Sequence, residues 1–172
     1  MYYQFPIEQV ATTSQTRFQS GFARMAMYLL PRLEDVTYEP TSIGLRILGT
    51  DETALSVPAE ILVEIYGEGI RLTKPRVRMI RDAEGTKEPI MNIRISAPLS
   101  AQEMVLHDLE DRGTLIQEVE QQLEAVVIRG QAPLRTLLGY QQVLGSMTAN
   151  TAHLWVWLSH YASIPSLDGP AA

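Results

Sequence analysis

The segment "EPIMNIRISAP" (88–98) decides the fold of the second half of the chain. Its apolar and polar residues alternate, it is rich in isoleucine, and prolines stand near both ends, a pattern typical of a β-strand. The following residues, 101–111, place Met104, Val105 and Leu109 at helical spacing, and Gly113 marks the end of this predicted helix. A strand that leads directly into an amphipathic helix indicates the start of an α+β unit.

Residues 114–165 continue this unit. Two strands, "TLIQEVE" (114–120) and "LEAVVIRGQ" (123–131), are predicted next, and a helix follows from Pro133. The last strand, "HLWVWLSHY" (153–161), is apolar on both faces, so we expect it at the centre of the sheet. The order β-α-β-β-α-β predicts a ferredoxin-like fold, in which two helices cover one face of a four-stranded antiparallel sheet.

The first half of the chain shows the same order of elements. Strands are predicted at 2–10, 36–39, 43–49 and 70–82, and helices at 14–35 and 57–67. The sequence therefore predicts an α+β protein with two tandem ferredoxin-like domains, 1–82 and 88–165. The short polar segment 83–87 is interpreted as a linker, and residues 166–172 as a disordered tail.

Composition limits the classes of function. The 172 residues include no cysteine and carry a formal net charge of −6, which excludes disulfides and thiolate ligands and restricts any nucleic-acid contact to a local patch. The three histidines lack the spacing of a metal site. No signal peptide and no apolar run near the roughly 18 residues of a membrane span are found. We expect a cytoplasmic protein without membrane contact, metal or cofactor.

Four motifs in the second half carry a family resemblance. "EPIMNIRISAP", "HDLEDRG", "PLRTLLGYQQVLGSMT" and "LSHY" follow one another in the order and spacing of the C-terminal, fifth domain of elongation factor G, a translational GTPase. The resemblance spans about 86–165 and agrees with the ferredoxin-like prediction. The matching positions are Glu88, Pro89, Arg112, Gly113, Gly139, Tyr140, Ser146, Thr148, Ser159, His160 and Tyr161.

The first half, 1–82, is more faintly similar to the third domain of the same family. "KPRVRMIRD" (74–82) parallels the strand that leaves that domain, whereas "GTDETALSVPAEI" (49–61) replaces a characteristic family segment. No P-loop occurs anywhere in the 172 residues, so nucleotide hydrolysis of the family's kind is not expected. Gly145 stands where the family has arginine, which argues against its ribosomal RNA contacts.

Ser159, His160 and Tyr161 invite a catalytic interpretation. Adjacent strand residues point to opposite faces, so we expect Ser159 and His160 to diverge. A nucleophile and its base must approach within hydrogen-bonding distance, and we therefore predict no catalytic site.

Trp155 and Trp157 share one face of the last strand, and with Tyr161 they form a candidate protein interface. A stacking platform for RNA bases is the alternative. A second candidate surface is the basic run Arg71, Lys74, Arg76, Arg78 and Arg81, which could contact phosphate groups of RNA or form a solvated strand face balanced by acidic residues of a neighbouring helix.

These patterns predict a non-catalytic interaction protein that acts through its sheets, either on a partner protein or by self-association as a homo-oligomer. The alternative is a ribosome- or RNA-associated accessory factor that uses the basic run to contact ribosomal RNA. No nucleotide is expected as a ligand.

Overall fold

The structure, a computed structural model, describes residues 3–164. The chain divides into two compact units, Met1–Arg78 and Met79–Ala172, and each is described by itself. The predicted disordered tail, 166–172, lies outside the described residues.

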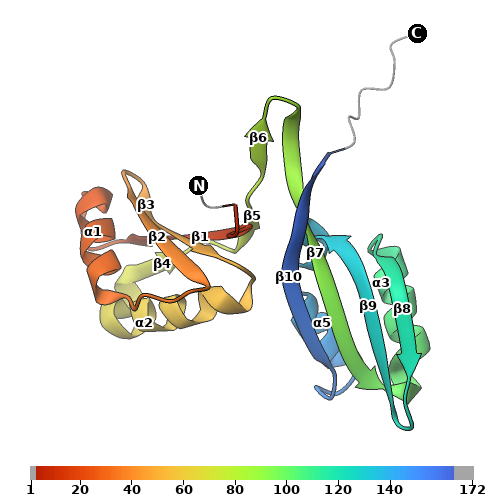
Figure 1. Ribbon diagram of the computed structural model, residues 1–172. Coiled ribbons are helices and arrows are strands. Elements are labelled where there is room, and N and C mark those ends of the chain that lie inside the picture. Colours follow the sequence, from red (N-terminus) through yellow and green to blue (C-terminus); the bar gives the residue numbers. More distant parts are fainter. Residues whose placement is uncertain (1–2, 165–172) are drawn as a thin grey trace. The chain divides into compact units, whose positions relative to one another are not determined.

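Unit 1 is a two-layer α+β unit (Figure 1). Its sheet has the order β2-β3-β1-β4, all neighbours are antiparallel, and the two-residue strand β5 pairs with β1. The helices α1 and α2 cover one face of this sheet. In chain order the elements are β1 (Ile7–Thr13), α1 (Gln19–Leu29), β2 (Val36–Thr41), β3 (Gly44–Gly49), η1 (Thr53–Leu55), α2 (Ser56–Tyr66), η2 (Gly67–Gly69), β4 (Ile70–Leu72) and β5 (Arg76–Val77).

The core of unit 1 follows from strand alternation. Ala11 pairs with Leu45, and both side chains are fully buried. They share the sheet face toward the helices, where α1 buries Phe22 and α2 buries Leu62. Gly44 closes the β2–β3 turn at φ +140, and a Cβ there would lie 2.4 Å from the carbonyl oxygen of Ala11. Only glycine fits this approach of two backbones.

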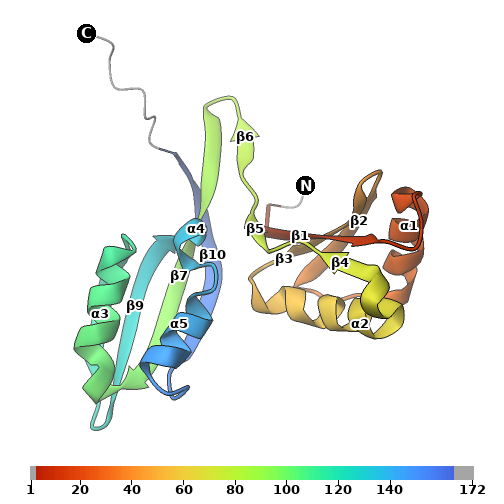
Figure 2. The ribbon, with the colours of Figure 1, turned by 180° about the vertical axis from the view of Figure 1, so that it is seen from behind.

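Unit 2 repeats the plan with the sheet order β10-β7-β9-β8, and the short strand β6 also pairs with β7. Its helices lie behind the sheet in Figure 1 and in front of it in Figure 2. The elements are β6 (Ile80–Asp82), β7 (Gly85–Pro98), η3 (Leu99–Ala101), α3 (Gln102–Asp111), β8 (Leu115–Gln121), β9 (Ala125–Pro133), α4 (Leu134–Leu137), α5 (Tyr140–Met147) and β10 (His153–Ser163).

Alternation along β7 separates the two faces of the sheet in unit 2. Met91, Ile93 and Ile95 are buried, and they face Val105 and Leu109 of α3 and other apolar residues of the helices. The residues between them are only half-buried and belong to the face without helices. The core of unit 2 therefore lies on one side of its sheet, as in a ferredoxin-like unit.

The structure corrects three sequence expectations. Residues 83–87 are not a linker, because Gly85 at φ +123 closes a β6–β7 hairpin in which Asp82 pairs with it. Residues 70–82 form three short strands, since Pro75 cannot donate to a ladder. The strand 153–163 lies at the edge of the sheet, not at its centre, and its two apolar faces are one half-buried face toward the helices and one exposed face.

The helix predicted from Pro133 is interrupted. It consists of α4 and α5, and Gly139 between them adopts a left-handed conformation at φ +73. No heavy atom would crowd a Cβ at this position, so glycine is required for its backbone conformation alone.

Gly139→Ala is expected to lower the free energy of unfolding of unit 2 by about 1–2 kcal/mol, because alanine is strained at positive φ. Gly139→Asn should cost less, since asparagine tolerates this conformation. Urea unfolding followed by tryptophan fluorescence reports unit 2, which contains both tryptophans. Equal stability of the alanine variant and the wild type would contradict this account.

Candidate functional site

The face of the second sheet that lacks helices displays both tryptophans of the chain. Trp155 and Trp157 of β10 are 46% and 48% exposed. Their neighbours Leu154, Val156 and Leu158 alternate with them and lie on the helix-covered side. Figure 1 shows this sheet in front of its helices. We call this surface, formed by Trp155, Trp157 and the residues beside them, the open face.

Arg94 of β7 holds one of these tryptophans. It pairs with Trp155 across the two strands, and its guanidinium carbon lies 5.0 Å from the centre of the indole ring. The centre of the His153 imidazole lies 6.0 Å from that of the same indole. The Nε of Arg94 is buried without a hydrogen-bond partner among the described residues. A cation over an aromatic face is attracted to it, so Trp155 is fixed in place while half of it remains available.

A row of polar side chains crosses the same face beside Trp157. The amide nitrogen of Gln131 donates to Asn92 Oδ1 at 2.9 Å and to Ser159 Oγ at 3.0 Å. Ser159 Oγ in turn lies 3.0 Å from His160 Nδ1. These hydrogen bonds join β7, β9 and β10, and they order amide and hydroxyl groups next to the tryptophans.

The contact between Ser159 and His160 corrects the sequence prediction that they diverge. The register of β10 against β7 shifts between Leu158 and His160, which marks a β-bulge. A bulge places two residues opposite one and breaks the alternation of faces. Ser159 and His160 thereby come to the same side, and Tyr161 turns to pair with Pro89 on the other side. Tyr161 therefore does not extend the Trp155–Trp157 surface as predicted.

The Ser159–His160 contact is within the range of a nucleophile and its base, but its setting differs from a catalytic site. Both residues are exposed. No carboxylate in the described residues makes an ion pair or hydrogen bond with His160 to orient it. A catalytic base normally has such a third group. The arrangement is suited to binding, since it offers hydrogen-bonding groups beside two aromatic rings.

Most residues of the family motifs support the fold of unit 2. The carboxylate of Glu88 is buried and lies 2.8 Å from Arg135 Nε of α4. Arg112 at the end of α3 contacts Asp108 at 2.8 Å and donates to the Thr136 carbonyl. Its guanidinium also lies 4.6 Å from the ring centre of Tyr140, the largest fully buried side chain of the described core.

Two further motif positions end helices. Gly113 adopts φ +72 after α3, where a left-handed residue closes the helix. Thr148 is buried after α5, accepts from the backbone N–H of Ala152 and donates to the Leu144 carbonyl. By contrast, Ser146 is exposed and donates to the Gln142 carbonyl within its own helix.

The side chain of Asn150 lies against Gly145, which stands where the family has arginine. A Cβ on Gly145 would lie 2.5 Å from the side-chain oxygen of Asn150. Asn150 itself adopts the left-handed conformation at φ 59, and its backbone N–H donates to the Gly145 carbonyl. The asparagine occupies the space where a longer side chain would begin. A side chain at 145 would therefore require the Asn150 side chain to move.

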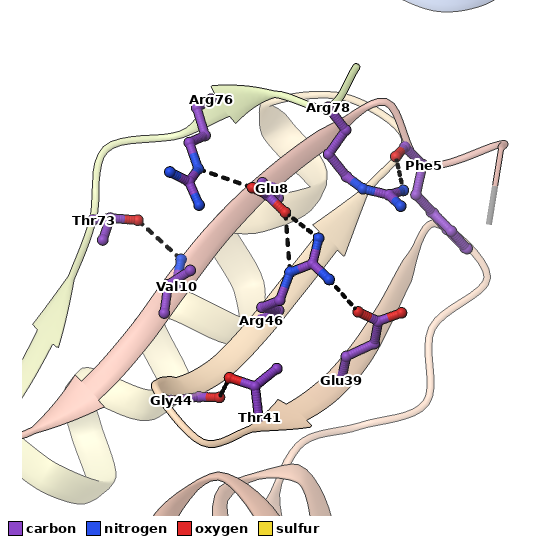
Figure 3. A network of polar contacts seen from close by, with 10 residues as sticks. All are labelled: Phe5, Glu8, Val10, Glu39, Thr41, Gly44, Arg46, Thr73, Arg76 and Arg78. Carbon is purple, nitrogen blue, oxygen red and sulfur yellow. Dashed lines mark hydrogen bonds and ion pairs between the residues drawn. The ribbon is translucent and has the colours of Figure 1, made fainter. Parts of the chain in front are cut away.

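The predicted basic run does not form one strand face. Arg76 is bound to Glu8, and Arg78 donates to the Phe5 carbonyl (Figure 3). Arg71 lies in β4, Lys74 lies between strands, and both are exposed. Arg81 belongs to β6 of the other unit. Phosphate contact by Arg71, Lys74 and Arg81 remains a prediction.

Glu8 is the centre of the polar network in Figure 3. Its carboxylate is buried and contacts Arg46 at 2.5 Å and Arg76 at 2.8 Å, and Arg46 also contacts Glu39 at 2.6 Å. By strand pairing these residues lie on the sheet face of unit 1 that does not face the helices. The charged side chains of Glu8, Glu39, Arg46 and Arg76 on this face pair with one another, so few of its charges are left for a partner.

Metal-binding clusters and membrane-spanning helices are both absent from the described part of the chain. Residues 3–164 contain no group of three or more His, Asp or Glu that could hold a metal ion. No helix in this part of the chain is long and apolar enough to cross a membrane.

Comparison with known proteins assigns unit 2 to a class. Residues 86–168 match the family described as elongation factor G C-terminus. The elongation factor G of Granulibacter bethesdensis is 35% identical over 100 residues, which are 58% of this chain and 13% of that protein. Mitochondrial ribosome-releasing factor 2 of Bos taurus is 32% identical over 81 residues, which are 47% of this chain and 10% of that protein.

A solved structure gives the same fold. A crystal structure from Thermus thermophilus covers 94% of this chain and 41% of its own length, with a TM-score of 0.64 and 14% identity. At this identity the likeness shows the fold alone, and it confirms the tandem ferredoxin-like prediction. The match of residues 86–168 to the elongation factor G C-terminus agrees with the resemblance that the motifs indicated, and this part of the chain is similar to translation factors.

Replacement of Arg46 should destabilise unit 1 more than replacement of Arg76. Arg46→Met leaves the buried Glu8 with one partner and frees Glu39, and we expect a loss of about 1–3 kcal/mol. The Arg76 side chain is 63% exposed, so Arg76→Met should cost less than about 1 kcal/mol. Denaturation followed by circular dichroism measures both, with the exposed Arg24→Met as the control. The opposite ranking would contradict the central role of Arg46.

Proposed function

We propose that this protein is a non-catalytic binding factor of the translation apparatus, and that its open face binds a protein partner. One observation carries the proposal: Trp155 and Trp157 lie side by side on a sheet face that their own unit leaves uncovered, and each is about half exposed. Tryptophan and arginine are the residues that contribute most to protein–protein binding.

The order of the open face supports binding. Arg94 fixes Trp155, and the hydrogen bonds of Gln131 fix Asn92 and Ser159 before any partner arrives. Side chains that are already ordered lose little conformational entropy on association. The face thus offers an aromatic area along the edge strand β10 with ordered polar groups beside it on β7 and β9.

The relatives suggest where the partner is found. The names of the matched proteins, elongation factor G and ribosome-releasing factor 2, belong to translation. The sequence contains no P-loop, so the proposed role does not include nucleotide hydrolysis of the P-loop kind. We place the protein in the cytoplasm, in association with ribosomes.

RNA is the second candidate partner. Arg94 over Trp155 and the amide of Gln131 could stack on and hydrogen-bond to unpaired bases. The acidic residues on the neighbouring strands weigh against it: Glu118 and Glu120 of β8 hold the other arginine of this face, Arg129, with Oε2–Nη1 distances of 2.6 and 3.7 Å. The protein partner therefore agrees better with the charges of the open face.

Ribosome binding should depend on the tryptophans. In co-sedimentation with purified ribosomes, Trp155→Ala and Trp157→Ala should each weaken binding at least about tenfold, because removal of a buried aromatic anchor is costly. Ile43→Ala, which truncates a 63% exposed residue of unit 1, is the matched control and should bind as the wild type. Failure of the wild type to sediment, or equal binding by the tryptophan variants, would refute the proposed function.

Salt separates the two candidate partners. A protein interface on the open face should change little between about 50 and 200 mM salt, whereas RNA contacts through several phosphates lose about 10³–10⁵ in affinity over this range. We expect weak salt dependence and no binding of fluorescent single-stranded oligonucleotides by anisotropy. Steep salt dependence together with oligonucleotide binding that Trp155→Ala abolishes would favour RNA instead.

A further inference from the structure

Four large apolar side chains at the start of α1 and along it are exposed. Phe18, Met25, Tyr28 and Leu29 are 80%, 62%, 80% and 50% exposed. Helical spacing places Phe18, Met25 and Leu29 next to the buried Phe22, at the margin of the buried side of the helix, and Tyr28 lies further toward the outside. Several large apolar side chains exposed on one short helix indicate an interaction site.

The same region is basic in an acidic chain. Residues 9–33 contain Arg17, Arg24 and Arg32 and no aspartate or glutamate, whereas the whole chain has a net charge of −6. All three arginines are exposed. None of them forms an ion pair within residues 3–164. Glu34 and Asp35 follow on the loop, so the region from 9 to 35 keeps a net charge of 3 − 2 = +1.

A hollow of about 480 Å³ lies beside this surface, between the end of α1 and β2. Its lining includes Met27, Tyr28, Leu33, Tyr38 and Arg32. The Tyr38 hydroxyl donates to the Pro31 carbonyl at 3.0 Å, and burial together with Asp35 raises the pKa of Tyr38 to about 12. The hydroxyl thus stays protonated and keeps its hydrogen bond to the Pro31 carbonyl beside the hollow. The hollow can accept an apolar side chain next to Arg32.

The chain itself contains a segment with the complementary chemistry. Leu123, at the turn between β8 and β9, is 95% exposed, the highest value of any large hydrophobic residue described. Residues 114–129 contain Glu118, Glu120 and Glu124 and one arginine, Arg129, which pairs with Glu118 and Glu120 and leaves Glu124 without an ion pair within residues 3–164. The β8–β9 turn therefore presents one protruding leucine with carboxylates on both sides.

We propose that the protein self-associates by inserting the β8–β9 turn of one copy into the α1 hollow of a second copy. Leu123 enters the hollow lined by Tyr28, Leu33 and Tyr38, and Glu120 and Glu124 face Arg24 and Arg32. Both partners of the contact are exposed apolar groups, and their surroundings carry opposite charge. The open face takes no part, so this contact is independent of the proposed partner binding.

Light scattering coupled to size-exclusion chromatography and sedimentation velocity over a range of protein concentrations test the contact. We expect the wild type to associate with increasing concentration and Leu123→Asp to raise the dissociation constant at least tenfold. Leu115→Asp is the matched control, because Leu115 is a 64% exposed leucine at the other end of β8. A wild type that stays monomeric, or association unchanged in Leu123→Asp, would overturn the proposal.

Charge reversal gives a sharper test, because all four charged residues lie on the surface. Arg24→Glu with Arg32→Glu in one chain, and Glu120→Arg with Glu124→Arg in another, should each weaken self-association. A mixture of the two variants should associate again, through the hollow of one and the turn of the other. Absence of this rescue would overturn the proposal. Loss of self-association in Trp155→Ala would also overturn it, because the open face would then form the contact. A protein that stays monomeric and binds anionic lipid vesicles through α1 would overturn it as well.

Discussion

Each unit of this protein has only two layers, so one face of each sheet is not covered by helices. The side chains on that face must be stabilised in another way. The units meet this constraint by different chemistry. Unit 1 closes its face with ion pairs around the buried Glu8, in which Arg46 and Arg76 neutralise the carboxylate. Unit 2 leaves two tryptophans half exposed and orders them with Arg94 and a row of hydrogen-bonded polar groups. This difference explains why unit 2 carries the candidate binding site and the corresponding face of unit 1 does not.

The residues that stabilise the fold of unit 2 are different from the residues that are exposed for binding. Glu88, Arg112 and Tyr140 connect the strands and helices of unit 2, so these motif positions have a structural role that needs no ligand. At Gly145, by contrast, Asn150 fills the space of a larger side chain. The family likeness of residues 86–168 thus supports a relation to translation factors, and the particular partner has to be argued from the exposed residues.

Much of the fold could be predicted from local patterns. The alternation in 88–98 and the helical spacing of 101–111 gave the correct elements, because each pattern reflects one buried face. The bulge at Ser159 could not be predicted, since it depends on the register against β7, which no local pattern reports. The same bulge decides the candidate site, where it turns His160 toward Ser159 and Tyr161 away. The predicted central position of the last strand was also wrong, because the sequence does not show whether a tryptophan is buried or exposed.

The two edges of the second sheet differ in how they resist unwanted pairing. The edge strand β8 carries Glu118 and Glu120, and charges on an edge discourage another strand from adding to it. The edge strand β10, His153–Ser163, contains no Asp, Glu, Lys or Arg. Its protection rests on the bulge at Ser159, which interrupts the regular row of backbone donors and acceptors. When the chain is heated or concentrated, β10 is therefore where intermolecular sheet growth and precipitation would begin.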